Sequence, residues 1–318
     1  MCPGFNTDPD LITDLRQTAV IDRELSRLNI DVACLQETRL AESGSLKENN
    51  YTFYWQGKPE QCPRIHGVGF AVKNNLLPCI DMFPLGNERM IHMRFASSQG
   101  RVNIICAYSP TLSATDEDKD SFFQSLEGAI KPIPKNEYLL LLGDFNARVG
   151  ADNNAWPNCL GPHGVGEIND NGQRLLEFCS AHNLCVTNTY FSGKECHKVS
   201  WQHPRSKRWH QLDLCITRRA DLKCILHTRS YHSADCNSDH SLVASKVKIH
   251  LKKAYSSSQP KTKRININHV NDPLKSEIFS TMLNKSLPTL KEKENRISDS
   301  SEKLRNVIYG SVLDAIGT

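Results

Sequence analysis

The sequence has no apolar run of about 18 residues, the length that a helix needs to cross a membrane. Its opening residues, Met1-Cys2-Pro3-Gly4, lack the charged and then apolar pattern of a secretory signal. The 12 cysteines form no CxxC pair and no regular framework, and several lie inside apolar runs. Buried reduced thiols fit this distribution best. These absences predict a nuclear or cytoplasmic protein that is not secreted and does not span a membrane.

The composition favours one large domain followed by a short appendage. With 318 residues, 39% of them hydrophobic, the chain can form one core of roughly 240 residues. We expect this domain over residues 1–251. The net charge is only +4, yet residues 252–264 contain five basic and no acidic side chains beside Ser256-Ser257-Ser258. This composition predicts a basic linker over residues 252–270, and helical spacing of apolar residues in 300–316 predicts a helical tail over 271–318.

One stretch organises the rest of the chain. Residues 138–142 are five large side chains in a row, which predicts a strand buried on both faces. Side chains alternate along a strand, so Asp144 and Asn146 point the same way while Phe145 points into the protein. Gly143 would leave room for a ligand to approach the backbone. A carboxylate and an amide at a strand end can activate and orient water, although an Asx turn that closes the strand is the alternative.

The remaining pattern alternates strands and helices. We expect helices over residues 10–29, 114–130 and 173–182, the last with a capping region at 169–172. Strands are expected over residues 30–35, 52–55, 67–72, 90–95, 102–108, 185–188, 199–202, 211–216 and 241–249. This order predicts a mixed α/β protein.

Several of these strands end in residues able to do chemistry. They are Glu37, Tyr108, Asp144 with Asn146, Asp213, and Asp239 with His240. If the strand ends share one rim, three or four carboxylates meet there, and these repel one another unless a hard cation lies among them. The pattern therefore indicates Mg²⁺. Taken alone, Glu37 could be a solvated strand-end charge and Asp213 a buried, hydrogen-bonded acid.

Four motifs carry a resemblance to a known superfamily. They are Leu35-Gln36-Glu37-Thr38, Tyr108-Ser109-Pro110, Gly143-Asp144-Phe145-Asn146-Ala147-Arg148 and Ser238-Asp239-His240-Ser241. Together they resemble the endonuclease/exonuclease/phosphatase superfamily, and most closely the endonuclease domain of RTE-type LINE retrotransposons and host proteins derived from them. The resemblance covers residues 2 to about 252. It implies a four-layer α/β sandwich, with two packed mixed sheets flanked by helices.

The resemblance also implies a metal site. Glu37 would be the principal Mg²⁺ ligand, with Asp239 near the metal, and Mn²⁺ would substitute. No small-molecule cofactor is expected. The family opens with a strand that ends in an asparagine at the metal, and this sequence is expected to lack that strand, for which Asn6 is a poor substitute. LINE relatives continue into a polymerase, so the tail resembles a truncated connection to one.

By the same resemblance, five residues would carry the catalysis. Asp144 would take the proton from the attacking water, which Asn146 would orient together with the phosphate. His240 would hold a phosphoryl oxygen, kept protonated by Asp213. Tyr108 would donate a hydrogen bond to the phosphate as charge builds in the transition state.

A basic and aromatic segment predicts DNA as the partner. Residues 193–211 contain five Lys or Arg against one Glu, with two tryptophans and three histidines interleaved. Basic side chains neutralise phosphates and aromatic faces pack on sugars or bases. The candidate DNA-binding residues are Lys198, Trp201, Arg205, Lys207 and Arg208. The alternatives are a solvated hairpin with Trp201 in the core, or a zinc site from Cys196, His197, His203 and His210, whose spacing matches no finger pattern.

Two classes of function remain open at this point. The first is a magnesium-dependent DNA endonuclease of the LINE or apurinic-site type. An inositol-phosphate or lipid phosphodiesterase would have the same fold without the basic segment. The second class is a catalytically impaired remnant of a retrotransposon that binds nucleic acid or a protein.

Overall fold

The computed structural model describes residues 17–234, 238–254 and 279–281. The chain divides into two compact units, residues 1–254 and 255–318. Of the predicted linker and tail, only residues 252–254 and 279–281 are described, and the latter are helical. The predicted helix start at residues 10–16 and the expectation for Asn6 also lie outside the described residues.

A six-stranded sheet forms the centre of the first unit. Its strand order is β5-β6-β7-β8-β12-β9, with bounds Ile80–Asn87, Met90–Ser97, Gly100–Tyr108, Tyr138–Asp144, Asp213–Arg218 and Leu184–Val186. Strands β7 and β8 are parallel and the other neighbours are antiparallel, so this sheet is mixed, as predicted. In β8, Leu139 and Leu141 pack on the side of the helices while Leu140 packs on the opposite side. The strand is therefore buried on both faces, as its sequence indicates.

A four-stranded sheet packs against it. Its order is β1-β4-β3-β2, with bounds Val32–Gln36, Val68–Lys73, Tyr51–Gln56 and Ser43–Lys47. The described strands of this sheet are all antiparallel, so the prediction of a second mixed sheet was wrong. Only residues 48–50 separate β2 from β3, and a connection this short joins antiparallel strands, whereas a parallel pair needs a long crossover. Two hairpins complete the strands, β10–β11 (Trp201–Gln202 and Trp209–His210) and β13–β14 (Ile225–Tyr231 and Leu242–Val247).

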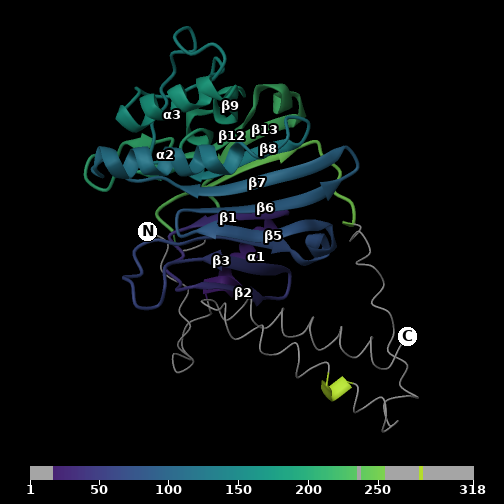
Figure 1. Cartoon of the computed structure of the whole chain (residues 1–318). Helices are drawn as coiled ribbons and strands as arrows, with labels where there is room; N and C mark the ends of the chain where they lie inside the picture. Colours follow the sequence, from purple (N-terminus) through teal and green to yellow (C-terminus); the bar gives the residue numbers. More distant parts are fainter. Residues whose placement is uncertain (1–16, 235–237, 255–278, 282–318) are drawn as a thin grey trace. The chain divides into compact units, whose positions relative to one another are not determined.

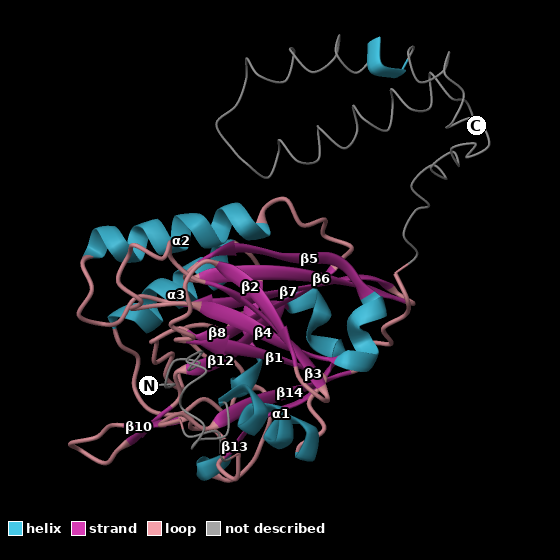
Figure 2. Ribbon diagram, turned by 90° about the horizontal axis from the view of Figure 1, so that it is seen from below, coloured by secondary structure: helices cyan, strands magenta, loops and turns pink. Residues whose placement is uncertain are grey.

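Helices cover the outer faces of both sheets. Figure 1 shows α2 (Asp116–Ile130) and α3 (Asp170–Ala181) above β7 and β6, with β1, β3 and β2 below these strands. Seen at a right angle, α1 (Gln17–Arg27) lies on the side opposite to α2 and α3 (Figure 2). Three apolar clusters fill the spaces between helices and sheets and between the sheets. The predicted four-layer α/β sandwich is confirmed.

Local signals explain where the helices begin. The Thr115 side chain caps α2 by accepting a hydrogen bond from Asp118 N at 3.2 Å, and the first turn is acidic. Asn169 caps α3 in the same way, within the predicted capping region. The described residues also contain four short 3₁₀ segments, η1 (Asn74–Cys79), η2 (Thr187–Thr189), η3 (Glu195–His197) and η4 (Arg219–Cys224). No helix in the described ranges combines the length and apolar character that a membrane crossing requires.

Candidate active site

The strand ends of the large sheet bring three predicted residues together. Tyr108 is the last residue of β7 and lies opposite Asp144, the last residue of β8, in the parallel register. Asp213 begins β12 and lies opposite Asp144 in the antiparallel register. Neighbouring residues in register share a face of the sheet. All three side chains therefore meet at one rim, on the side that faces the smaller sheet.

Glu37 reaches the same rim from the smaller sheet. It follows β1, and its Oε1 accepts a hydrogen bond from the Tyr108 hydroxyl at 2.7 Å. Its Oε2 lies 3.1 Å from Arg39 Nη2. The backbone of Glu37 is left-handed, with φ of 53°, which is strained for a residue other than glycine. Because its side chain is 25% exposed, the carboxylate remains accessible from solvent.

The segment after β8 combines a turn with the site. The backbone N–H of Asn146 donates to Asp144 Oδ1 at 2.8 Å, so the Asx turn considered from the sequence is present. Asn146 has φ of 48°, and its Nδ2 donates to Ser109 O at 3.0 Å. Phe145 is 1% exposed in the core under the helices, as predicted. The Asx turn therefore does not exclude a role in the site, because Asp144 forms the turn and also lies at the rim.

Gly143 serves a different purpose from the one expected. A Cβ at this position would lie 1.9 Å from Ala107 O, and its φ of 149° is a conformation that favours glycine. The close approach is made by the backbone of the neighbouring strand β7. The prediction that Gly143 makes room for a ligand was therefore wrong.

Asp213 and His240 form the charged pair of the site. His240 Nδ1 lies 2.8 Å from Asp213 Oδ2. Burial alone would lower the pKa of His240, but the Asp213 and Asp144 carboxylates outweigh it and raise the pKa above its usual value. This pairing favours the imidazolium form, in which Nδ1–H donates to Asp213 and Nε2–H points away from it. The ring can therefore present a charged donor to an anion.

Two further groups hold their protons more tightly than usual. Burial, the neighbouring Asp213 carboxylate and Glu37 raise the pKa of Asp144 to about 7, against the opposing effects of His240 and the Asn146 N–H. Burial and the hydrogen bond to Glu37 raise the pKa of Tyr108, so its hydroxyl remains a donor. The rim therefore holds a poised carboxyl, a phenol donor and a charged imidazole.

The carboxylate oxygens at the rim are the type of ligand that a hard cation such as Mg²⁺ binds. The described residues contain no cluster of three or more His, Cys, Asp or Glu arranged to hold a metal ion. Mg²⁺ does not need one, since it keeps several waters and binds through one or two carboxylates together with substrate phosphates. Glu37 accepts a hydrogen bond from the Tyr108 hydroxyl, and the charges of Glu37 and Asp144 both raise the pKa of Tyr108.

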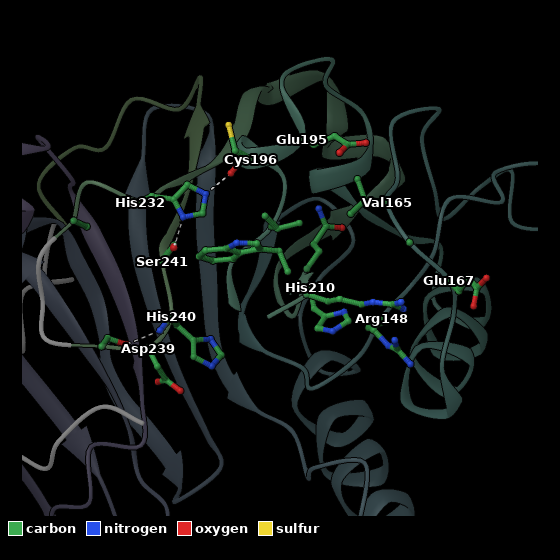
Figure 3. A pocket seen from close by; sticks show the side chains of 17 residues that line it. Arg148, Val165, Glu167, Glu195, Cys196, His210, His232, Asp239, His240 and Ser241 are labelled. Carbon is green, nitrogen blue, oxygen red and sulfur yellow. Dashed lines mark hydrogen bonds between the residues drawn. The ribbon is translucent and has the colours of Figure 1, made fainter. Parts of the chain in front are cut away.

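A large cavity lies beside this rim. It has a volume of about 920 Å³, and Arg148, Arg208, His210 and His240 contribute to its lining. Figure 3 shows Asp239 and His240 on one side of it, with Arg148 and His210 on the other. Arg148 follows β8 and His210 belongs to β11, so the cavity joins the catalytic rim to the basic hairpin.

The candidate DNA-binding residues are distributed along that hairpin. Trp201 is half-buried at its base, where its ring centroid lies 6.2 Å from that of His240. Its Nε1 donates to Asp239 Oδ2 at 3.2 Å, which places the predicted metal residue Asp239 beside Trp201. Arg205 and Lys207 are exposed in the turn, Arg208 lines the cavity, and Lys198 is half-buried at the end of η3.

Two of the four candidate zinc ligands, His197 and His203, have other contacts. His197 Nε2 lies 3.3 Å from Arg229 Nη2, and the His203 ring accepts the backbone N–H groups of Arg205 and Ser206. The described side chains include no group of three or more His, Cys, Asp or Glu arranged to hold a metal ion, so Cys196 and its neighbouring histidines do not form such a group. The zinc alternative was wrong for the described residues.

Three residues of the site were not singled out from the sequence. Arg148 was quoted only as the end of its motif, yet it lines the cavity. Arg39 pairs with Glu37. Asn171 was recognised only within a helix cap, yet its side chain contacts two of the loops that carry the candidate catalytic residues. Only the position of Arg148 at the end of the strand-end motif could have indicated its role.

Comparisons of the sequence identify related proteins. Residues 8–240 match the profile of the Endonuclease/Exonuclease/phosphatase family. Craniofacial development protein 2 of Bos taurus is 31% identical over 233 residues, which cover 73% of this chain and 39% of that protein. The protein of the same name from Tragulus javanicus is 30% identical over 233 residues, covering 73% and 40%. The chain thus spans about two fifths of the length of these relatives.

Solved structures share the fold. The catalytic domain of Xenopus laevis APE2 matches with a TM-score of 0.56 at 16% identity, covering 75% of this chain and 90% of that one. The endonuclease domain of TRAS1, a telomere-specific non-LTR retrotransposon, matches with a TM-score of 0.51 at 15% identity, covering 73% and 92%. An AP endonuclease from Archaeoglobus fulgidus has a TM-score of 0.51 at 14% identity, covering 73% and 94%.

Proposed function

The chain belongs to the endonuclease/exonuclease/phosphatase family, and from this premise we propose that it is a magnesium-dependent phosphodiesterase that cleaves DNA, of the LINE or apurinic-endonuclease type. One observation carries the proposal. Tyr108, Glu37, Asp144 and the Asp213–His240 pair converge from two sheets on one accessible rim. Core packing does not require so many polar groups at one place, whereas hydrolysis of a phosphodiester uses each of them.

The proposed steps assign each group by its chemistry. Asp144 accepts the proton of the attacking water, a role for which a carboxyl with a pKa of about 7 is well suited near neutral pH. Asn146 orients that water and the phosphate. His240, charged through Asp213, donates to a phosphoryl oxygen, and Tyr108 donates as negative charge develops.

Glu37 is the proposed principal ligand of Mg²⁺ or Mn²⁺, with Asp239 nearby. When bound, the cation supplies charge stabilisation for the departing 3′ oxygen. The hydrogen bond from Tyr108 and the ion pair with Arg39 fix both oxygens of Glu37 and so orient this ligand.

DNA is the proposed substrate because of the surroundings of the rim. The hairpin presents Arg205, Lys207 and Arg208, and Arg148 adds a fourth positive charge at the cavity beside His240. Such a surface attracts a polyanion, whereas a small inositol phosphate or a lipid headgroup needs no extended basic hairpin. Cleavage of DNA in cells would require access to the nucleus.

A plasmid-nicking assay tests the proposal directly. We expect nicking with Mg²⁺ and none with EDTA. Asp144→Asn and His240→Ala should each reduce the rate by about 10²–10⁴-fold, the usual contribution of a positioned acid or base. His92→Ala is a matched control, because His92 is a half-buried histidine of β6 whose Nε2 bonds Asn103 Oδ1 at 3.0 Å, and its rate should not change. Binding of DNA without nicking under any metal condition would instead support the impaired-remnant function.

A further inference from the structure

The beginning of α3 is docked on the loop that follows Asp144. Asn169 N donates to Arg148 O at 3.1 Å, and Asn169 Oδ1 accepts from Arg148 N at 3.0 Å and from Gly172 N at 2.8 Å. A Cβ at Gly172 would lie 1.8 Å from Arg148 O, so only glycine permits this approach. The helix start and the loop are therefore held together by backbone groups and by the Asn169 side chain.

Asn171 extends this contact to a second loop. It is 3% exposed, and its Nδ2 donates to Pro110 O and to Asn146 O, each at 3.1 Å. Both partners are carbonyl oxygens, so the amide can adopt only this orientation. Its Oδ1 is buried without a hydrogen-bond partner among the described atoms, which is costly. The two hydrogen bonds that Asn171 donates explain why an amide with an unsatisfied oxygen is buried at this position.

These two bonds tie together the loops that carry the reacting groups. Pro110 follows Tyr108 by two residues, and Asn146 follows Asp144 by two residues. The loops also contact each other, since Ser109 N donates to Asp144 O at 2.9 Å and Asn146 Nδ2 donates to Ser109 O at 3.0 Å. Asn171 adds a brace from a third element, the helix.

We propose that Asn171 is a positioning residue for the cleavage reaction: it holds the Tyr108 loop and the Asp144–Asn146 loop in register. This proposal rests on the proposed function. Asn146 has the left-handed φ of 48°, and its carbonyl is one of the two atoms that Asn171 holds. Without the brace, Asn146 and the Asp144 carboxylate that accepts its N–H can shift, and a displacement of about 1 Å is enough to cost a factor of about 10² in rate.

The first test is Asn171→Ala. We expect kcat for nicking to fall by about 10- to 100-fold, as for residues that orient catalytic groups. KM and the Kd for DNA should stay within about twofold, because Asn171 is buried and does not reach the substrate. A residue that only stabilised the fold would not produce this split.

Asn103→Ala is the matched control. Asn103 is 1% exposed, and its Nδ2 donates to Glu137 Oε2 at 2.9 Å and to Tyr138 O at 3.2 Å. It also braces β7 against the beginning of β8, but at the end of the sheet remote from Tyr108. Below the melting temperature of both variants, its kcat should equal that of the wild type. An equal loss of kcat in the two variants, or an unchanged kcat in Asn171→Ala, would overturn the proposal.

A second variant tests the chemistry of the brace. Asn171→Asp keeps the shape but places a carboxylate oxygen against two carbonyl oxygens. It should lose more kcat than Asn171→Ala if the donated hydrogen bonds matter. A rate like that of the wild type would contradict the assignment.

Hydrogen exchange tests the brace without any activity. In Asn171→Ala, the backbone N–H groups of Ser109 and Asn146 should exchange on the order of 10-fold faster than in the wild type, while Asn103→Ala leaves them unchanged. If the wild type binds DNA but does not nick it, the proposed function fails. The exchange rates would still show whether Asn171 holds the two loops together. Unchanged exchange at both amides would refute it.

Discussion

Asp213 and Asp144 lie directly opposite each other on neighbouring antiparallel strands, at the rim of the large sheet. Two carboxylates side by side, Asp144 buried and Asp213 half-buried, disfavour a second negative charge. Asp213 has a counter-ion, since His240 Nδ1 lies 2.8 Å from its Oδ2. Asp144 accepts a hydrogen bond from the Asn146 N–H and has a pKa raised to about 7. The environments of the two carboxyls thus separate their roles, one as counter-ion and one as proton acceptor.

The first prediction concerns the Asp213–His240 pair. In Asp213→Asn, the pKa of His240 should fall, because the attraction that offsets burial is removed. An NMR titration of the imidazole in metal-free protein measures it. Asp221→Asn is the control, since Asp221 lies in η4 beyond the far end of β12. A pKa of His240 that did not move in Asp213→Asn would show that the 2.8 Å contact is not maintained in solution.

The second prediction concerns stability and pH. The folded pKa of Asp144 is raised from 3.8 to about 7, so the folded state binds the proton more tightly than the unfolded state does. The free energy of unfolding of metal-free protein should therefore decrease as pH rises from 3.8 to about 7 because of this group, and its contribution should be constant above that range. Asp144→Asn removes this slope. Chemical denaturation across the range measures it, and equal slopes in both proteins would exclude a raised pKa.

The third prediction concerns the metal. Glu37→Gln should shift the Mg²⁺ dependence of nicking to higher concentration, because an amide binds a hard cation less well than a carboxylate. The hydroxyl of Tyr108 can still bond the amide oxygen, so the local structure should persist. Glu24→Gln is the control, since Glu24 also forms an ion pair, with Arg27 in α1. An unaltered Mg²⁺ titration would argue against Glu37 as the ligand.

The fourth prediction compares two glycines. Gly143→Ala should destabilise the protein by at least about 2 kcal/mol, because the added Cβ meets the Ala107 carbonyl and the φ of 149° suits glycine only. Gly128→Ala, inside α2 with no atom within 4 Å of the added Cβ, should stabilise it by about 0.5–1 kcal/mol. Thermal melting of both variants measures the difference. Equal melting temperatures of the two variants would show that β7 and β8 can move apart at this position without a loss of stability.

Much of the site could be predicted because it lies at strand ends. A buried strand can be read from its apolar run, and the first polar residue after it must lie at the sheet rim. Tyr108 and Asp144 follow this rule at the ends of β7 and β8, and Asp213 reaches the same rim as the first residue of β12, which is antiparallel to β8. Glu37 belongs to the other sheet, so its contact with Tyr108 depends on how the two sheets pack, and here the resemblance to a known superfamily supplied the role.

Two of the strands that were missed, β13 and β2, lack a regular apolar pattern. Strand β13 buries Thr228 and Ser230 along with a single apolar residue, Ile225, and Thr228 bonds the Thr187 hydroxyl at 2.8 Å. Strand β2 is the exposed edge of its sheet, with Leu46 as its one large apolar residue. Asn171 was missed for a related reason. Its partners are backbone carbonyls of residues 110 and 146, and a sequence carries no signal for such tertiary contacts.

The fifth prediction concerns the basic hairpin and separates binding from chemistry. Replacing Arg205, Lys207 and Arg208 by Ala should weaken binding to duplex DNA and reduce the slope of log K against log salt concentration by about 0.9 for each phosphate that is no longer neutralised. Lys131, Lys135 and Lys223 form a control triple of equal charge, exposed near the ends of β8 and β12 opposite to Asp144 and Asp213. Their replacement by Ala removes the same net charge but should leave the slope nearly unchanged. An equal effect of both triples would mean that DNA responds only to net charge, whereas an unchanged slope in the hairpin variant would place the DNA on another face.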